Sequence, residues 1–250
     1  MFLAARENDI RDATQAISAA RDDSQRAKAY SSRGVAYSEK ARYSRMFKLI
    51  PMDEYERLFD LAMKDHDRAV ALDPKNAEVY FNRAQAYYDR GCLDLLEKKD
   101  GKSWLGPAAS DFEKATERDP HFALAFDRLG LTYEANDEAD KAIRAYTQQM
   151  ALDPFGKQRL ADAYCNIGFR HEQQKQFVDA AMAYEKSTEF GSADDKSCPY
   201  EPFANLVAIY TTETRQYDKA WETVRRALKH GRFIAPEILE RLRRDSGRSS

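Results

Sequence analysis

The sequence is short of the residues that build β-sheets. Valine and isoleucine together number only 14 in 250 residues, whereas alanine numbers 37. Sheets favour β-branched side chains and helices favour alanine, so sandwiches, barrels and doubly wound sheets are disfavoured. Glycine (10) and proline (8) are also too few for many long loops. The composition therefore predicts an all-α chain whose helices are joined by short connections.

No charge of one sign dominates the chain, and no long apolar run is present. The 40 basic and 42 acidic residues are interspersed and leave a net charge of −2. Nucleic-acid binding needs a basic face or stripe, so no nucleic-acid partner is expected. No apolar stretch approaches the length of about 18 residues that a membrane span requires, and no signal peptide is recognised at the start. We therefore expect no membrane insertion.

Cysteine is scarce, and its spacing indicates neither disulfides nor metal ligands. Cys92, Cys165 and Cys198 are odd in number and far apart, and no C-x-x-C motif occurs. This favours a reduced chain in the cytoplasm, while a periplasmic location stays open if a signal peptide was removed. Cys165 is read as an isolated small hydrophobic residue at a position that would face the groove described below.

What the chain does contain is an internal repeat. The dipeptide Asp-Pro closes an alanine-rich amphipathic run three times, ending at Pro74, Pro120 and Pro154, and the last two prolines are 34 residues apart. Small residues recur in register in the middle of each predicted first helix and at the start of each second helix. Two helices cross closely only where a side chain is small, so this pattern predicts antiparallel helix pairs. The first series is Gly34, Ala84, Gly130, Gly168 and Val207, and the second is Ala62, Ala108, Ala142, Ala180 and Ala220.

These spacings resemble the tetratricopeptide repeat (TPR), a helix–turn–helix unit of about 34 residues. The resemblance covers about residues 27–230. It implies an all-α, right-handed α-solenoid of about five repeats, with extended first two repeats and capping helices at both ends. The expected organisation is an N-terminal half-repeat or capping helix at 1–26, a TPR array at 27–235 (repeats 27–76, 77–122, 123–156, 161–194 and about 200–233), and a C-terminal capping helix with a frayed tail at 236–250.

The first two repeats depart from the regular spacing between the two small positions. That spacing is 12 residues from Gly130 to Ala142 but 28 in the first repeat and 24 in the second. The first insertion is expected to lengthen both helices around a turn near Ile50–Pro51. The second contains two glycine-containing breaks, which predict a short helix at Leu93–Lys98 and then a loop that holds Trp104. Trp104 is a candidate anchor for a second interaction surface.

Catalytic signatures are missing. The four histidines are dispersed, and no H-E-x-x-H, G-x-S-x-G or glycine-rich phosphate-binding motif occurs. His66 and His171 occupy positions where other repeats hold tyrosine or phenylalanine, so they are expected to be packing residues rather than bases or ligands. We therefore expect no enzyme, no catalytic residue, no metal site and no cofactor.

The TPR resemblance implies a concave face, lined by the first helices, that holds an extended peptide or a partner helix. One slot of this face, two residues before the small position, carries three of the six asparagines in the chain. An asparagine could grip a peptide backbone through its amide, or it could bridge neighbouring first helices, and both readings stay open. The slot residues are Ser32, Asn82, Arg128, Asn166 and Asn205, and neighbouring apolar or aromatic candidates are Phe81, Tyr88, Leu124, Leu131 and Phe169.

The expected function is a non-enzymatic adaptor that binds a protein or peptide segment in this groove. A regulatory or targeting subunit of an enzyme, or of an envelope or secretion assembly, is the alternative. The carboxylate clamp of TPR co-chaperones is matched only in part. Asn82 and Arg128 agree with it, but Ser31, Val35 and Leu124 replace its other residues. The oligomeric state and the partner's identity are not indicated by the sequence.

Overall fold

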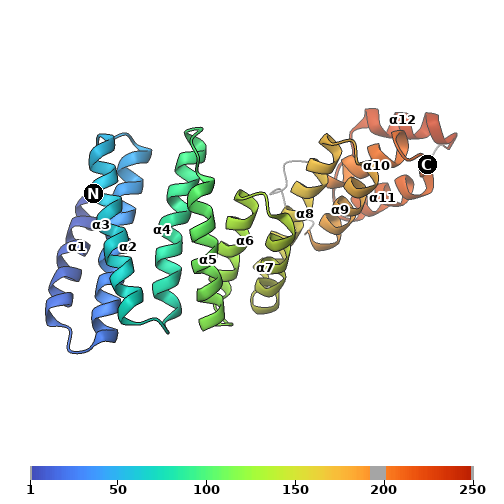
Figure 1. Ribbon diagram of the computed structural model, residues 1–250. Helices are drawn as coiled ribbons and strands as arrows, with labels where there is room; N and C mark the ends of the chain where they lie inside the picture. The colour runs from blue at the N-terminus through green and yellow to red at the C-terminus, as the bar shows by residue number, and fades with distance from the viewer. Residues whose placement is uncertain (1, 192–200, 249–250) are drawn as a thin grey trace. The chain divides into compact units, whose positions relative to one another are not determined.

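The computed structural model of the chain describes residues 2–191 and 201–248. Within these ranges every regular element is an α-helix, and the prediction of an all-α fold built from TPR-type helix pairs is confirmed. The helices form two compact units, residues 1–138 and 139–250 (Figure 1). The boundary falls inside the span expected for the third repeat, between its first and second helices.

The first unit contains six helices, in which α2 pairs with α3 and α4 pairs with α5. Helix α1 packs on α2, and α6 packs on α4 and α5. Side-chain caps start two helices, because Asp22 accepts from the amide of Gln25 and Asn76 accepts from the amide of Glu78. The bounds are α1 Phe2–Ala19, α2 Asp23–Met46, α3 Met52–Leu72, α4 Ala77–Leu96, α5 Lys102–Arg118 and α6 Ala123–Ala135.

Close helix crossings depend on the small residues of the repeat. A Cβ atom added at Gly34 would lie 2.8 Å from the ring of His66 on the paired helix. The same arrangement recurs in the second unit, where a Cβ at Gly168 would lie 2.7 Å from the ring of Tyr184. Since heavy atoms in a packed core stay farther apart than this, glycine lets the ring lie directly against the facing backbone.

Each of the two extended helix pairs contains an equivalent arginine–aspartate ion pair, which the sequence did not predict. Arg33 of α2 holds Asp65 of α3 through two hydrogen bonds of 2.6 and 2.9 Å. One repeat later, Arg83 of α4 holds Asp111 of α5 with the same two distances. Both carboxylates are almost fully buried. Each arginine directly precedes the small residue of the crossing, so the pair fixes the register of the two helices.

The second insertion differs from its prediction. Helix α4 continues unbroken to Leu96, and Trp104 lies in the first turn of α5 rather than in a loop. Its ring packs edge-on against Phe59 at 5.4 Å, and its Nε1 donates to Asp94 at 3.1 Å. The guanidinium of Arg90 lies 5.1 Å from the same ring. Trp104 is therefore a half-buried packing residue inside the extension and not an exposed anchor.

The second unit contains α7 to α12 and has its own core. Tyr184, Leu206 and Trp221 are buried within it, together with Leu242 of the last helix. Cys165 is fully buried and disulfide-bonded, so the expectation of an isolated, reduced, groove-facing cysteine was wrong. Cys198 lies outside the described residues. The bounds are α7 Ala139–Leu152, α8 Phe155–Gln173, α9 Phe177–Phe190, α10 Pro202–Thr212, α11 Tyr217–Lys229 and α12 Pro236–Ser246.

Candidate functional site

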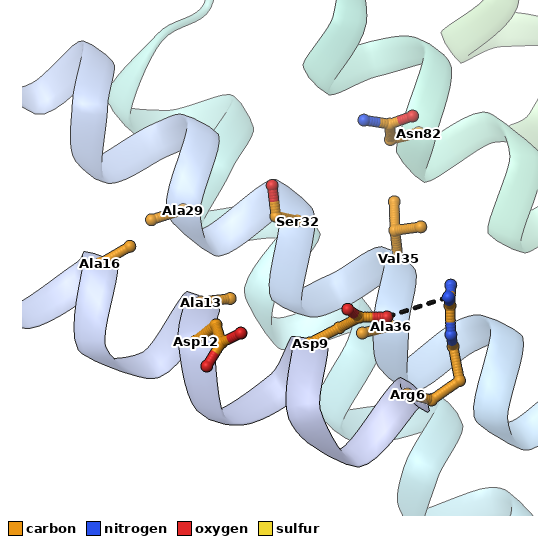
Figure 2. A pocket seen from close by; sticks show the side chains of 10 residues that line it. All are labelled: Arg6, Asp9, Asp12, Ala13, Ala16, Ala29, Ser32, Val35, Ala36 and Asn82. Atoms are coloured by element: carbon orange, nitrogen blue, oxygen red, sulfur yellow. Dashed lines mark ion pairs between the residues drawn. The ribbon is translucent and has the colours of Figure 1, made fainter. Parts of the chain in front are cut away.

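Two adjoining cavities lie over the first helices of the first unit. The larger, about 580 Å³, is bordered by α1, α2 and α4, and Figure 2 shows Asn82 of α4 facing it together with Ser32 and Val35 of α2. The smaller, about 390 Å³, is bordered by α2, α4 and α6. Val35 and Asn82 line both, so we treat them together as one groove. The other residues lining the smaller cavity are Ser38, Glu39, Arg42, Phe81, Gln85, Ala86, Asp89 and Arg128.

Asn82 stands at the junction of the two cavities and also ties two helices together. Its side-chain amide donates to the hydroxyl of Ser31 on α2 at 2.9 Å. This bond is the bridge between neighbouring first helices that the sequence left open as the alternative to peptide binding. The amide carbonyl of Asn82 accepts no hydrogen bond from the protein among the described contacts. One side of the amide thus fixes the side chain while the other borders the groove.

An ion pair forms part of the smaller cavity's wall. Arg42 of α2 lies 3.2 Å from the carboxylate of Asp89 on α4. Gln85 donates to the same carboxylate at 2.8 Å. Burial raises the pKa of Asp89, and the nearby arginine opposes that shift by favouring the charged form. The pair crosses from α2 to α4 and gives this wall a fixed polar surface.

Arg128 of α6 places a cation at the groove, close enough to Asp89 for its charge to lower the pKa of that carboxyl. Its Nε is buried, and no hydrogen-bond acceptor lies within reach among the described residues. No carboxylate of the described chain forms an ion pair with it. The hydroxyl of Ser38, on the opposite wall, is likewise buried without a partner. A buried donor without an acceptor costs free energy, so a ligand acceptor at this position would be favoured.

Helix α1, expected as a half-repeat or capping helix, forms one border of the groove. Arg6, Asp9 and Asp12 of this helix border the larger cavity (Figure 2). Arg6 pairs with Asp9 at 3.0 Å and with Glu39 of α2. The second pair fastens α1 across the first helix of the array. Asp12 is largely exposed at the groove's rim.

Of the apolar and aromatic candidates in the first unit, some line the groove and others do not. Phe81 lines the smaller cavity but also packs on Phe112 at 5.5 Å and on Phe122 at 4.9 Å, so it belongs partly to the core. Tyr88 and Leu131 are half-buried and line neither of the two described cavities. Burial raises the pKa of Tyr88. The groove's apolar surface therefore comes from Val35, the edge of Phe81 and a set of alanines: Ala13, Ala16, Ala29, Ala36 and Ala86.

The remaining candidates belong to the second unit. Asn205 on α10 donates to the hydroxyl of Tyr184 on α9 at 3.0 Å, so its side chain joins two helices of its own unit. Asn166 and Phe169 lie half-buried on α8. The two described cavities of the first unit are lined by residues of that unit, and a role of Asn166, Phe169 and Asn205 in partner binding stays a prediction.

Several groove residues were missed, although a signal for them exists. Asn82, Gln85 and Asp89 follow an i, i+3, i+7 spacing on α4, and such residues share one helix face. Val35, Ser38 and Arg42 repeat the same spacing on α2. Extending the face along the lengthened helices would have found these polar residues.

The described residues give no sign of a catalytic centre. His66 is fully buried, and burial lowers its pKa to about 3, with the nearby Arg83 acting in the same direction. Neither of its ring nitrogens has a hydrogen-bond partner. Among residues 2–191 and 201–248, no cluster of three or more histidine, cysteine or acidic side chains could hold a metal ion. No helix within these ranges is both long and apolar enough to cross a membrane.

Comparisons with known proteins agree with the repeat pattern. A family model described as "TPR repeat" matches residues 59–91. The Hsp70-Hsp90 organizing protein of Triticum aestivum is 27% identical over 126 residues, which is 50% of this chain and 18% of that protein. Hsp70-Hsp90 organizing protein 3 of Arabidopsis thaliana is 28% identical over 105 residues, 42% of this chain and 17% of that protein. The chain thus spans less than a fifth of these relatives.

Among solved structures, the crystal structure of MamA protein is similar in fold. It is 20% identical, covers 79% of this chain and 91% of its own, and superposes with a TM-score of 0.45.

Proposed function

The chain belongs to the tetratricopeptide repeat family, and from that premise we propose that its first unit binds an extended peptide segment of another protein. The proposed role is non-catalytic: the unit presents a groove, and the partner supplies the segment that fills it. Recognition of peptides by a preformed groove needs an apolar surface with a few fixed polar groups. The groove along α1, α2, α4 and α6 has this composition.

The observation that carries the proposal is the buried Nε of Arg128, which has no hydrogen-bond acceptor among the described residues. It borders the same cavity as Asn82, whose carbonyl is available to a backbone amide of the ligand. An acidic side chain or a terminal carboxylate of the segment would pair with Arg128. Asn82 and Arg128 are also the two positions that agree with the carboxylate clamp, while the lysines of that clamp are absent here. We therefore propose an acidic segment as ligand, without assigning it to a chaperone.

The test starts from a displayed library of random peptides, from which binders of the full chain are selected. Affinity of a selected peptide is then measured by fluorescence anisotropy for wild type, for Arg128→Met and for Asn82→Ala. Removing a charge-assisted hydrogen bond costs about 1.5–3 kcal/mol, so Arg128→Met should weaken binding by roughly ten- to a hundredfold.

Arg144→Met is the matched control, because this exposed arginine lies on α7 in the second unit. It should leave the affinity unchanged. Circular dichroism establishes that all variants keep the wild-type helix content. Equal affinity of wild type and Arg128→Met for every selected peptide would refute the proposed groove.

A further inference from the structure

Exposed apolar side chains of the first unit gather at two helix turns. Met46 ends α2, Phe47 and Leu49 lie in the turn between α2 and α3, and the three are 53%, 54% and 53% exposed. Leu95 and Leu96 end α4 and are 36% and 81% exposed. Large apolar residues scattered singly on a surface are ordinary, but a concentration of this kind marks an interaction site. We call these five residues the tip patch.

The two turns lie side by side at one edge of the first unit. Arg45, at the end of α2, forms an ion pair with Glu97, which directly follows α4. Both turns are at the upper edge of this unit in Figure 1, beyond the end of the shorter α6. Helices α2 to α5 contain 17 to 24 residues, whereas α6 contains 13. The extra length of the insertions therefore carries the tip patch away from the groove.

The base of the extension is firmly packed. Arg90 is buried and forms ion pairs with Glu56 at 2.7 Å and with Asp94 at 3.0 Å. Its guanidinium also lies against the rings of Tyr55 and Trp104. A well-packed base below exposed apolar turns indicates that the turns are presented by a fixed support.

The tip patch has a local charge opposite to that of the whole chain. Residues 45–50 and 95–100 hold four basic and two acidic residues, while the chain carries a net charge of −2. Lys48, Lys98 and Lys99 are exposed, and Lys99 forms an ion pair with Glu97 at 2.8 Å. Lys48 stands between Phe47 and Leu49 in the sequence. Long lysine side chains can lie along an apolar surface and place their ammonium groups at its polar boundary.

Apolar residues at the tips of turns suit a flat, deformable partner better than an extended peptide. The two described cavities are lined by other residues, so the tip patch is not part of the groove. Apolar side chains can enter the boundary between lipid headgroups and acyl chains, while the surrounding lysines meet the headgroup phosphates. Each lysine near an anionic leaflet contributes about 1 kcal/mol of attraction.

We propose that the tip patch docks the protein reversibly on an anionic membrane surface. Phe47, Leu49 and Leu96 enter the interfacial layer, and Lys48 and Lys98 bind the anionic headgroups. The protein lies on the membrane through these turns and does not span it. The groove stays open to a peptide, so membrane docking and the proposed peptide binding are separable.

The experiment is co-sedimentation of the full chain with vesicles of phosphatidylcholine alone and of phosphatidylcholine with phosphatidylserine. We expect binding to the anionic vesicles that weakens as salt rises. The variant Phe47→Ser/Leu96→Ser and the charge reversal Lys48→Glu/Lys98→Glu should each reduce the bound fraction at least about tenfold. Helix content and thermal unfolding verify that both variants fold.

The matched control is Val178→Ser/Met182→Ser, which removes two apolar side chains of similar exposure from α9 in the second unit. It should sediment like wild type, and so should Arg128→Met. Failure of the wild type to bind anionic vesicles overturns the proposal, as does equal binding by both tip variants. Loss of self-association in the tip variants without any vesicle binding would instead assign the patch to a protein interface and also overturn it.

Discussion

His66 provides a quantitative test of how the first helix pair is packed. Its imidazole is fully buried against Gly34, and both ring nitrogens lack hydrogen-bond partners. The equivalent position in the next repeat is Phe112, which is also fully buried. His66→Phe should therefore fit the site and remove two unsatisfied polar atoms. Each such atom costs about 1–3 kcal/mol, so the variant should be at least as stable as wild type near pH 7.

The pH dependence of the difference in stability between His66→Phe and wild type is the more discriminating measurement. The pKa of His66 falls from 6.5 to about 3 on folding, because burial disfavours the imidazolium. Below pH 6.5 the unfolded chain binds a proton that the folded chain does not bind, so stability is lost as pH falls from 6.5 towards 3. At about pH 5 this single group removes roughly 2 kcal/mol from the free energy of unfolding.

The assay is urea unfolding followed by tryptophan fluorescence at several pH values. A Trp221→Phe background leaves Trp104 as the reporter of the first unit, because the chain has only two tryptophans. The stability advantage of His66→Phe should grow by roughly 2 kcal/mol between about pH 7 and about pH 5. A constant difference across this range would refute the conclusion that His66 is buried in its neutral form.

Three further predictions concern the contacts that build the first unit. Asp111→Ala removes the buried partner of Arg83, which keeps its exposed partner Asp67 at 2.8 Å, and should lower the free energy of unfolding by about 1.5–3 kcal/mol, measured by urea titration. Gly34→Ala should cost about 1–3 kcal/mol in the same assay, because the added methyl overlaps the facing ring; an unchanged midpoint would contradict that crossing. In a double-mutant cycle, Asn82→Ala and Ser31→Ala should show a coupling of about 1 kcal/mol, and strict additivity would exclude the bridge between α2 and α4.

The helix pairing could be predicted because it depends on local periodicity. Small residues at fixed intervals indicate where two helices cross. The rings that fill the space beside each crossing occupy equivalent positions in each repeat. The second insertion was misread because glycine has two uses. Gly91 was taken as a break, but it lies inside α4, where a Cβ atom would be 2.9 Å from Leu105 of α5. Only the paired helix reveals that this glycine serves packing.

The candidate site was predictable in part for the same reason. Asn82 and Arg128 follow from the repeat register, and both border the groove. The ion pair of Arg42 with Asp89 joins residues 47 positions apart. The two residues lie on α2 and α4, helices that the insertions make longer than those of a regular repeat. Sequence periodicity places each residue on a helix face, but it does not say which charges meet. The division into two units likewise depends on long-range contacts that no local pattern encodes.

The most direct test of the peptide-binding account is the nuclear magnetic resonance signal of the Arg128 Nε–H group during titration with a selected peptide. The account predicts that this signal shifts progressively and reaches its end point as the peptide saturates the protein. The corresponding signal of Arg144 should stay in place. Saturation by the peptide with an unmoved Arg128 signal would contradict the account, because the ligand would then be held elsewhere.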